Sequence, residues 1–439
     1  MKKINITAMT FLLSFSTSAF ADDLLSVYKA AIQNDPQFRA SQAEYLAQQE
    51  SKTQSIAALL PSISASAHYT ELDNETVGGG TSGFDNYKKT NGYNLNLIQP
   101  LYRHENYVGL RQASASVAQA TATFENAKQD LILRVAKQYF AVLAAEDDLE
   151  FAKAERKAIK EQLIQTQQRF NVGLIAITDV HEAQARYDQA VARAIVAENT
   201  LAISHETLRE ITATDHSALS PLSVKHPLVE PNPSDIKQWV ETANTQNALL
   251  IASKNNVDVA REEVSRQRGG HYPNLDLAVN HDFTEYTDGG GAFTDSEQTN
   301  NSITIQLSVP LYQGGIVNSR TRAAAHRLTQ AREILEQQKR ATERQTRSSY
   351  LSVIASISTV KALKQALASS TVALEATQAG FEVGTRTAVD VLDSQRELYL
   401  AKRNYAQVRY NYVLETLNLK LAAGTLSLLD LEALNPWLK

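Results

Sequence analysis

The chain has 439 residues with 43 basic and 48 acidic side chains, and the resulting net charge of −5 excludes a protein held on nucleic acid by a basic surface. It has no cysteine, which excludes disulfides, thiolate metal sites, cysteine nucleophiles and a lipid anchor on an N-terminal cysteine. No uninterrupted run of about 18 apolar residues occurs, so no transmembrane helix is predicted, and the low glycine and proline content predicts a mostly helical chain.

Residues 1–21 are predicted to be a cleaved secretory signal peptide. Lys2 and Lys3 give a positive start, an apolar stretch follows, and Ala19-Phe20-Ala21 fits the small-residue cleavage pattern. The mature chain is then expected to begin at Asp22 and to be exported across the inner membrane of a bacterium. An N-terminal anchor helix is the alternative, but the apolar stretch is short for one.

A tandem repeat organises the rest of the chain. Three segments recur at an offset of 210–212 residues: Asn171-Val172-Gly173 as Glu382-Val383-Gly384, Pro100-Leu101-Tyr102 as Pro310-Leu311-Tyr312, and Pro61 as Pro273. Each half is predicted to hold a helix, two strands and a long helical hairpin. The predicted parts are a first repeat over 22–215 (strands at about 62–76 and 88–100, hairpin 101–212), a linker over 216–237, a second repeat over 238–424 (strands at about 273–286 and 300–310, hairpin 311–423) and a C-terminal segment over 425–439.

The predicted strands alternate between apolar and polar residues. Leu95 and Leu97 alternate with asparagines, and Ile303 and Ile305 alternate with threonine, glutamine and serine. Such a pattern is typical of tilted strands in an outer-membrane barrel, but equally of an antiparallel sheet in a soluble domain. The strands alone leave both possibilities open.

A polar loop is predicted between the strands of each pair, over 73–89 and 285–301. Residues 78–83 formally match the dinucleotide pattern G-x-G-x-x-G, but no helix follows them, so they are predicted to be a flexible loop. His216 and His226 flank a proline-containing linker and are expected to be solvated. The chain contains no H-E-x-x-H, G-x-S-x-G or Walker A motif, so no enzyme is predicted.

The long helices carry the clearest periodicity. No proline occurs between Pro100 and Pro221, and about 70 helical residues would span roughly 100 Å. The partner helix has an alanine-rich seam from 180 to 208, with steps of three and four residues, and 391–419 repeats its register. Each half is therefore predicted to fold back as an antiparallel hairpin at Gly173 and at Gly384. Two adjacent seams on the first long helix indicate neighbours on two sides, as in a closed cylinder of helices.

Four strands per chain cannot close a membrane barrel, for which about eight is the practical minimum. Open sheet edges are not tolerated in lipid. The strand count therefore predicts that several copies share one barrel, and three copies give twelve strands.

Four segments closely resemble the TolC family of trimeric outer-membrane channel-tunnels of Gram-negative bacteria. They are FNVGLIAITDV at 170–180, VGTRT at 383–387, VDVLD at 389–393 and PLYQGG at 310–315. The resemblance extends from about residue 23 to 430, with the duplication in the same place.

The resemblance implies a 12-stranded β-barrel in the outer membrane and a long α-helical barrel in the periplasm. A mixed belt would come from about 216–237 and from Gly424 onward. It implies a homotrimer in outer-membrane lipid, a periplasmic adaptor (membrane fusion) protein, and an inner-membrane RND, ABC or MFS transporter as partners. The implied function is a passive exit duct for multidrug efflux and type I secretion, with no catalysis, cofactor, metal or nucleic acid.

The resemblance also implies a periplasmic gate formed by Asp179, Thr178, Arg386, Phe381 and Gln162. Arg386 has no counterpart in the first repeat, and it is expected to bond toward Asp179 and Thr178 so as to hold adjacent hairpins closed. Gln162 matches a gate position but could equally be an ordinary polar residue on a wet helix.

Asp390 and Asp393 lie three residues apart on one predicted helix face. A solvated helix surface is the plain alternative, but both match the acidic constriction ring of the family and are predicted to line the pore. Two residues depart from the family pattern: Phe381 stands where close relatives have tyrosine, and Gln378 where they have glutamate. Both departures bear on the closing network.

The competing function is a non-transport periplasmic coiled-coil scaffold or adhesin stalk built on the same heptads. The strand pairs, their polar loops and the single-copy Arg386 argue against it. A simple diffusion porin is a third possibility, but porins lack long helical hairpins. The substrates are beyond the sequence, because a shared duct takes its specificity from the transporter.

Overall fold

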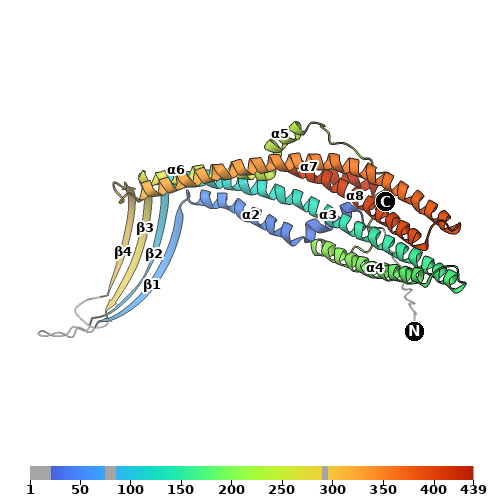
Figure 1. Ribbon diagram of the computed structural model, residues 1–439. Helices are drawn as coiled ribbons and strands as arrows, with labels where there is room; N and C mark the ends of the chain where they lie inside the picture. Colours follow the sequence, from blue (N-terminus) through green and yellow to red (C-terminus); the bar gives the residue numbers. More distant parts are fainter. Residues whose placement is uncertain (1–20, 75–85, 289–294, 439) are drawn as a thin grey trace, which may run out of the picture.

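Figure 1 shows the computed structural model of the chain, which describes residues 21–74, 86–288 and 295–438. The predicted signal peptide up to residue 20 and the glycine-rich residues 78–83 lie outside the described residues. The fold is mainly helical with one antiparallel sheet at one end, which confirms the predicted fold class.

The two halves of the chain contain matching elements. The first half holds α1 (Leu24–Asn34), α2 (Pro36–Ala57), β1 (Ser62–Asn74), β2 (Asn86–Tyr102), α3 (His104–Asn171) and α4 (Ile177–Thr212). The second half holds α5 (Ile236–Gln246), α6 (Ala248–Arg268), η1 (Gly269–His271), β3 (Asn274–Asp288), β4 (Ser296–Ser308), α7 (Ile316–Glu382), α8 (Ala388–Ala423), α9 (Leu428–Leu434) and η2 (Asn435–Trp437). Both α4 and α8 have 36 residues, and their ends lie 211 residues apart.

The long hairpins begin later than the sequence predicted. The β2 strand continues to Tyr102 past a register shift, so α3 starts at His104 and not at 101. In the second half α7 starts at Ile316 and not at 311, because Gly314 and Gly315 adopt positive φ values of 60° and 79° and break the chain direction first.

The sheet has the order β1-β2-β3-β4 with every pair antiparallel. The middle pair, β2 with β3, joins the two halves of the chain, so the repeats meet inside one sheet. Each outer strand pairs on one side only within the described residues, which leaves the backbone groups on the outer side of β1 and β4 without a strand partner in this chain. The strands sweep away from the ends of the helices as a curved layer (Figure 1).

The register gives the sheet one apolar and one polar face. Residues directly opposite each other share a face, so Ile63, Leu97, Val279 and Ile303 form one apolar row. The neighbouring row on the other face is polar, with Ser64, Asn96, Asn280 and Ser302. The apolar face is open to the surroundings in the single chain, where Ile303 is 78% exposed and Ile305 is 67% exposed.

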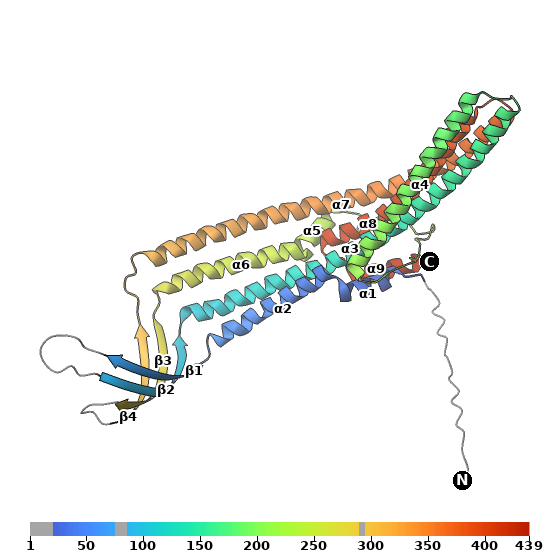
Figure 2. The same cartoon turned by 90° about the horizontal axis from the view of Figure 1, so that it is seen from below.

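The helices form two sets along the length of the molecule. Near the sheet α2, α3, α6 and α7 lie side by side (Figure 2). Beyond the middle, α3 pairs with α4 and α7 pairs with α8 as two antiparallel hairpins that end together at the far tip (Figures 1 and 2). The seam of α4 faces inward as its spacing requires, since Val180, Ala183, Ala190, Ala194 and Ala197 are all buried.

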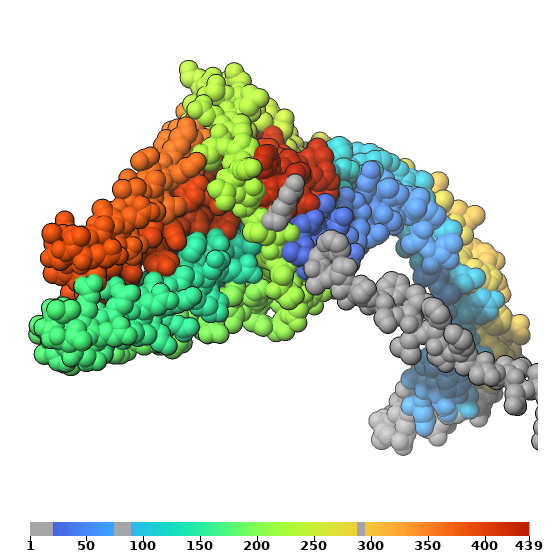
Figure 3. All heavy atoms as spheres, turned by 90° about the vertical axis from the view of Figure 1, so that its right-hand side faces the viewer, coloured from blue at the N-terminus to red at the C-terminus, as the bar shows by residue number. Residues whose placement is uncertain are grey.

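A belt crosses the middle of the molecule. We define it as residues 22–34, which include α1, residues 213–235, α5 and residues 424–438. Two isolated β-bridges tie it together, Asp22 to Leu219 and Leu222 to Leu438. The α5 helix and the chain before it project from the surface beside the long helices (Figures 1 and 3). Its buried side chains cover α7 and α8, so the belt joins segments that are far apart in the sequence.

The belt corrects the expectation that the two linker histidines are solvated. His216 is only 9% exposed, and its Nδ1 lies 2.7 Å from a carboxylate oxygen of Asp22. His226 packs edge-on against the rings of Tyr412 and Trp437, and burial together with the charge of Arg409 lowers its pKa. The linker folds back onto the start of the described chain at His216, and onto α8 and the C-terminal segment at His226, so neither ring is solvated as expected.

Within the described residues, α7 is the one helix that passes a length-and-composition test for a membrane span. It contains an 18-residue window of mean hydropathy 1.2, of which 17% is buried. No uninterrupted apolar run predicts this helix from the sequence, because the window also contains polar residues. One such helix is weak evidence for a span.

Candidate functional site

The candidate site lies at the far tip, where the two hairpins of the chain end side by side. The α3–α4 turn contains Gly173 at φ +76°, and the α7–α8 turn contains Gly384 at φ +79°. A Cβ on either glycine would meet nothing within 4 Å, so the backbone conformation, and not space, requires glycine here. Sequence reasoning named both residues as hairpin turns.

The two turns start their second helices differently. In the α7–α8 turn, Thr387 and Asp390 form a capping box: the Asp390 N–H donates to Thr387 Oγ1 at 3.2 Å, and the Thr387 N–H donates to Asp390 Oδ2 at 2.9 Å. These hydrogen bonds, helped by the charge of Arg386, lower the pKa of Asp390. The described residues provide α4 with no such side-chain cap.

Thr178 and Asp179 lie in the first turn of α4, and Arg386 lies in the α7–α8 turn. The aliphatic part of Arg386 packs on Gly380, where an added Cβ would come within 2.8 Å of Arg386 Cγ. Among the described residues of this single chain, no ion pair joins Asp179 to Arg386. The predicted contact between adjacent hairpins therefore stays a prediction.

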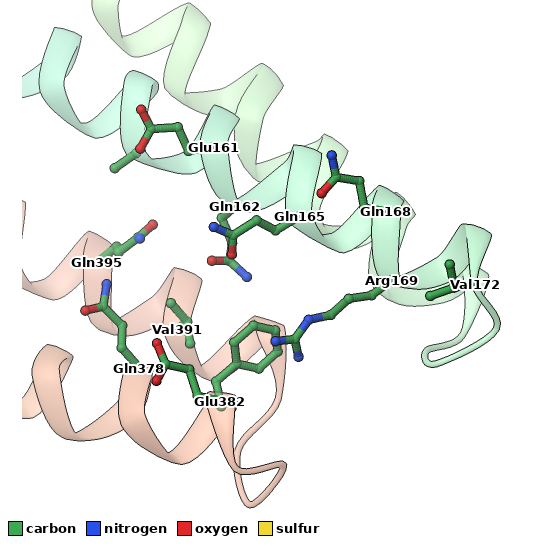
Figure 4. A pocket seen from close by; sticks show the side chains of 12 residues that line it. Glu161, Gln162, Gln165, Gln168, Arg169, Val172, Gln378, Glu382, Val391 and Gln395 are labelled. Carbon is green, nitrogen blue, oxygen red and sulfur yellow. The ribbon is translucent and has the colours of Figure 1, made fainter.

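Phe381 connects the two hairpins of one chain. Its side chain is 7% exposed and forms a small apolar cluster with Ala388 and Val391. The guanidinium of Arg169, on α3, lies 4.0 Å from the centroid of the Phe381 ring. This is a cation–π contact between the last turn of α3 and the last turn of α7. In Figure 4 Arg169 reaches from the first hairpin across to the second.

A cleft of about 790 Å³ separates the hairpins above this contact. Gln162 lines it from α3 and Gln395 from α8, and both are 6% exposed. This corrects the alternative that Gln162 is an ordinary polar residue on a wet helix, because the second hairpin covers it. Neither Nε2 of Gln162 nor Oε1 of Gln395 has a hydrogen-bond partner in the described part of the chain. Gln378 lines the same cleft and is exposed.

The two predicted ring carboxylates are not equivalent. Asp390 takes part in the capping box described above. Asp393 accepts a hydrogen bond from Arg186 of α4 at 2.9 Å and lies 4.0 Å from Arg396. Because Arg186 belongs to the other hairpin, this ion pair also joins the two hairpins. Part of the expected negative charge of Asp393 is balanced within the chain.

A buried glutamate joins three helices further from the tip. Glu155 on α3 is 2% exposed, and it accepts hydrogen bonds from Arg193 of α4 at 2.6 Å and from Arg403 of α8 at 3.4 Å. Arg403 also lies 2.8 Å from Asp148. The charge of Glu155 is thus compensated, as a buried charge requires.

Sequence reasoning did not find Arg169, Arg186, Gln395 or Glu155. The partners of Arg169, Arg186 and Glu155 lie more than 30 residues away, those of Arg169 and Arg186 in the other repeat, and Gln395 shares a cleft with residues of the other hairpin, so no local spacing reveals them. The repeat itself marks the position of Phe381. Phe170 is its counterpart in the first repeat, so an aromatic residue lies next to the last residue of the long helix in both halves. Arg169, beside Phe170, has Gly380 as its counterpart, so this arginine is present in the first half only.

Comparisons with known proteins agree with this architecture. The family described as "Outer membrane efflux protein" matches residues 27–214 and 239–425. The chain is 39% identical over 434 residues to "Outer membrane protein TolC" of Vibrio cholerae, covering 97% of this chain and 96% of that protein. It is 30% identical over 437 residues to "Alkaline protease secretion protein AprF" of Pseudomonas aeruginosa, covering 96% and 88% respectively.

The fold is also similar to that of solved channels. The Campylobacter jejuni CmeC outer membrane channel superposes with a TM-score of 0.77 at 14% identity, covering all of this chain and 98% of that one. At this identity the likeness bears on the fold alone. It confirms the predicted combination of a helical barrel and a β-barrel.

Proposed function

Because the chain belongs to the outer membrane efflux protein family, we propose that three copies of it form the exit duct for multidrug efflux and type I protein secretion. The protein is an outer-membrane channel, and its predicted localisation and family are confirmed. The competing scaffold or adhesin stalk is not favoured. We propose further that the channel is a homotrimer, that it works with an adaptor and a transporter, and that it catalyses no reaction.

The observation that carries the proposal is the two-faced, open-edged sheet. A row such as Ile63, Leu97, Val279 and Ile303 suits lipid, and the serines and asparagines of the opposite face suit a water-filled lumen. Unpaired edges are too costly in hydrocarbon, so β4 of one copy must pair with β1 of the next. Three copies then close a barrel of twelve strands.

The long hairpins support the periplasmic part of the proposal. Helices α3 and α7, of 68 and 67 residues, are each about 100 Å long at 1.5 Å per residue, so the tips lie far from the sheet. An inner-membrane transporter and a periplasmic adaptor engage these tips, and the transporter supplies the energy. The duct itself catalyses nothing and needs no cofactor.

Two neighbouring residues of β4 test the membrane assignment as a matched pair. Ile305 lies on the apolar face and Thr304 on the polar face. A lysine on the lipid face costs about 2–4 kcal/mol at the bilayer centre and less near either interface, so Ile305→Lys is expected to oppose insertion, whereas Thr304→Lys places the same charge in the lumen. Outer-membrane fractionation and native mass spectrometry should show a trimer for wild type and Thr304→Lys, and reduced assembly for Ile305→Lys. A stable monomer, or equal behaviour of the two variants, contradicts the shared barrel.

Conductance and crosslinking test transport and partners. Purified protein in planar bilayers should give single-channel steps, which a scaffold cannot give.

A photocrosslinker at Val172 or Val383, which are 72% and 75% exposed at the two turns, should capture the periplasmic adaptor in cells. The same crosslinker at Val224 of the belt, 69% exposed, is the control. Equal capture from all three positions contradicts docking at the tips.

A further inference from the structure

The cleft between the hairpins of one chain has the chemistry of a binding site. It holds two glutamates from opposite hairpins, Glu161 of α3 and Glu382 of α7, and carboxamides from three helices (Figure 4). Among the ion pairs of the described residues, neither glutamate takes part. Both carboxylates are therefore free to accept hydrogen bonds from a ligand.

Two buried glutamine side chains in the cleft each have a polar atom without a hydrogen-bond partner among the described residues. Gln162 and Gln395 are each 94% buried and point into the space between the hairpins (Figure 4). In the described residues, Nε2 of Gln162 and Oε1 of Gln395 make no hydrogen bond. Buried polar atoms of native proteins are nearly always satisfied. Nε2 of Gln162 is a donor and Oε1 of Gln395 is an acceptor, so the Gln395 oxygen is the atom that a hydrogen-bond donor of a ligand can satisfy.

The charge of the cleft favours a cation. Among the described residues that line it, Arg169 is the one basic side chain, and its guanidinium is already placed over the ring of Phe381. Glu161 and Glu382 then leave a net negative charge. An anion would meet two carboxylates, whereas an ammonium group can donate to carboxylate and amide oxygens alike.

The residues that line the cleft favour an organic cation over a metal ion. The described residues contain no group of three or more histidine, cysteine, aspartate or glutamate side chains that could hold a metal. Val172, Phe381 and Val391 provide apolar surface beside the polar groups. A hydrocarbon chain with ammonium groups matches both parts of this lining.

We propose that this cleft binds an aliphatic polyamine, with its ammonium groups held by Glu161, Glu382 and the amide oxygen of Gln395. The ligand joins the two hairpins of one chain, because its partners lie on α3, α7 and α8. The site goes beyond the duct function, and it is separate from the predicted acidic ring at Asp390 and Asp393, neither of which lines the cleft.

The test is isothermal titration calorimetry of the full-length protein in detergent with spermidine. The wild-type chain and each variant are titrated beside a matched version that carries Asp390→Asn and Asp393→Asn, so that binding at the ring is measured separately. The expected result is one equivalent of spermidine per chain, weakened at least tenfold by Glu161→Gln with Glu382→Gln. The matched control is Glu198→Gln with Glu375→Gln, which removes the same charge from exposed positions outside the cleft and should bind as the parent does.

Gln395→Leu keeps the size of the side chain but removes its oxygen, and it should weaken binding several-fold. Mg²⁺ at equal ionic strength should not displace spermidine. Equal affinity of the two glutamate pairs, displacement by Mg²⁺, or no heat of binding overturns the proposal. Because binding is measured without a membrane, its failure is distinguishable from failure of the channel, which conductance reports.

Discussion

The belt and the hairpin tips are built on the same long helices but are held together differently. The largest apolar cluster of the molecule surrounds the belt and draws on α1, α3, α8, the linker and the C-terminal segment, with Leu24, Tyr139, Leu219, Leu417 and Leu438 among its members. Nearer the tips, the clusters shrink to Ile159, Ala183, Ala190 and Leu392, and then to Phe381, Ala388 and Val391.

The polar contacts of the two regions also differ, because the belt has contacts to the backbone in addition to side-chain pairs such as His216 with Asp22. At the belt, side chains of the long helices donate to backbone carbonyls of the linker: buried Tyr139 to Ser220 at 2.7 Å, and half-buried Arg409 to Leu222 at 2.8 Å. Burial raises the pKa of Tyr139, so it stays a hydrogen-bond donor. At the tips, Arg169 with Phe381 and Arg186 with Asp393 join side chain to side chain. We infer that the belt is the fixed frame and that the hairpins can move below it.

The largest expected effect is a loss of stability when a buried leucine of the belt cluster is truncated. Leu417 and Leu392 lie on the same helix, α8, and each is 2% exposed, but Leu417 belongs to the belt core and Leu392 to the small cluster. Leu417→Ala should cost about 2–5 kcal/mol of stability, and Leu392→Ala should fall at the low end, since a small cluster relaxes more easily. Denaturant unfolding of the trimer measures both. Equal losses would mean that the two regions are equally well packed.

Glu155 tests the charged junction between the two regions. Glu155→Leu leaves Arg193 and Arg403 without their shared carboxylate, which should cost about 1–3 kcal/mol because the arginines are 38% and 26% exposed and stay partly hydrated. Hydrogen exchange should quicken in the hairpins beyond residue 155 but not in the belt. The control is Glu198→Leu on the exposed side of α4. Quicker exchange in the belt as well would show that the hairpins do not move separately.

Arg386 tests the predicted lock between adjacent hairpins. An exposed ion pair is worth about 0.2–1 kcal/mol, and threefold symmetry makes three such contacts act together. Arg386→Ala should therefore raise single-channel conductance and admit vancomycin into cells, while Arg386→Lys should retain part of the closure. Wild-type conductance and antibiotic resistance in a properly folded Arg386→Ala trimer would exclude this residue as the lock.

Phe381 tests the contact within one chain. Phe381→Leu keeps an apolar side chain but removes the ring under Arg169, a loss of about 0.5–1 kcal/mol. It should raise open probability slightly, and Arg169→Gln should do the same without adding to it in the double variant. Phe381→Tyr should favour closure if Asp179 is within reach of the new hydroxyl. Additive effects of Phe381→Leu and Arg169→Gln would show that the two residues act independently.

The smallest effect concerns the predicted acidic ring. Multivalent cations applied from the periplasmic side should block the channel, and Asp390→Asn with Asp393→Asn should abolish the block. Arg186→Gln should strengthen it by freeing Asp393. Because the pKa of Asp390 is below its ordinary value of 3.8, the carboxylate stays charged as pH falls, and block should persist to a lower pH than an ordinary aspartate allows. Block that is lost well above pH 3.8 would point to other groups.

The sequence by itself determined the repeated plan of this protein. Turn glycines, the proline spacing and the alanine seam of α4 are local or periodic signals. The spacing of apolar residues along a helix or strand indicates which of its faces is buried. The seam residues Ala183, Ala190 and Ala197 are buried as that spacing requires. The family, the fold class and the localisation also followed from short motifs, and the comparisons confirm them.

The tertiary structure alone decided which groups meet between the two hairpins. Arg169 contacts Phe381 and Arg186 contacts Asp393, although each pair is about 200 residues apart in the sequence. Gln162 lines a cleft whose other wall comes from the second repeat. Spacing along one helix says which face is buried but not which side chain of another helix covers it. That choice depends on how the hairpins are set beside each other by the belt, so no repeat or heptad could have revealed it.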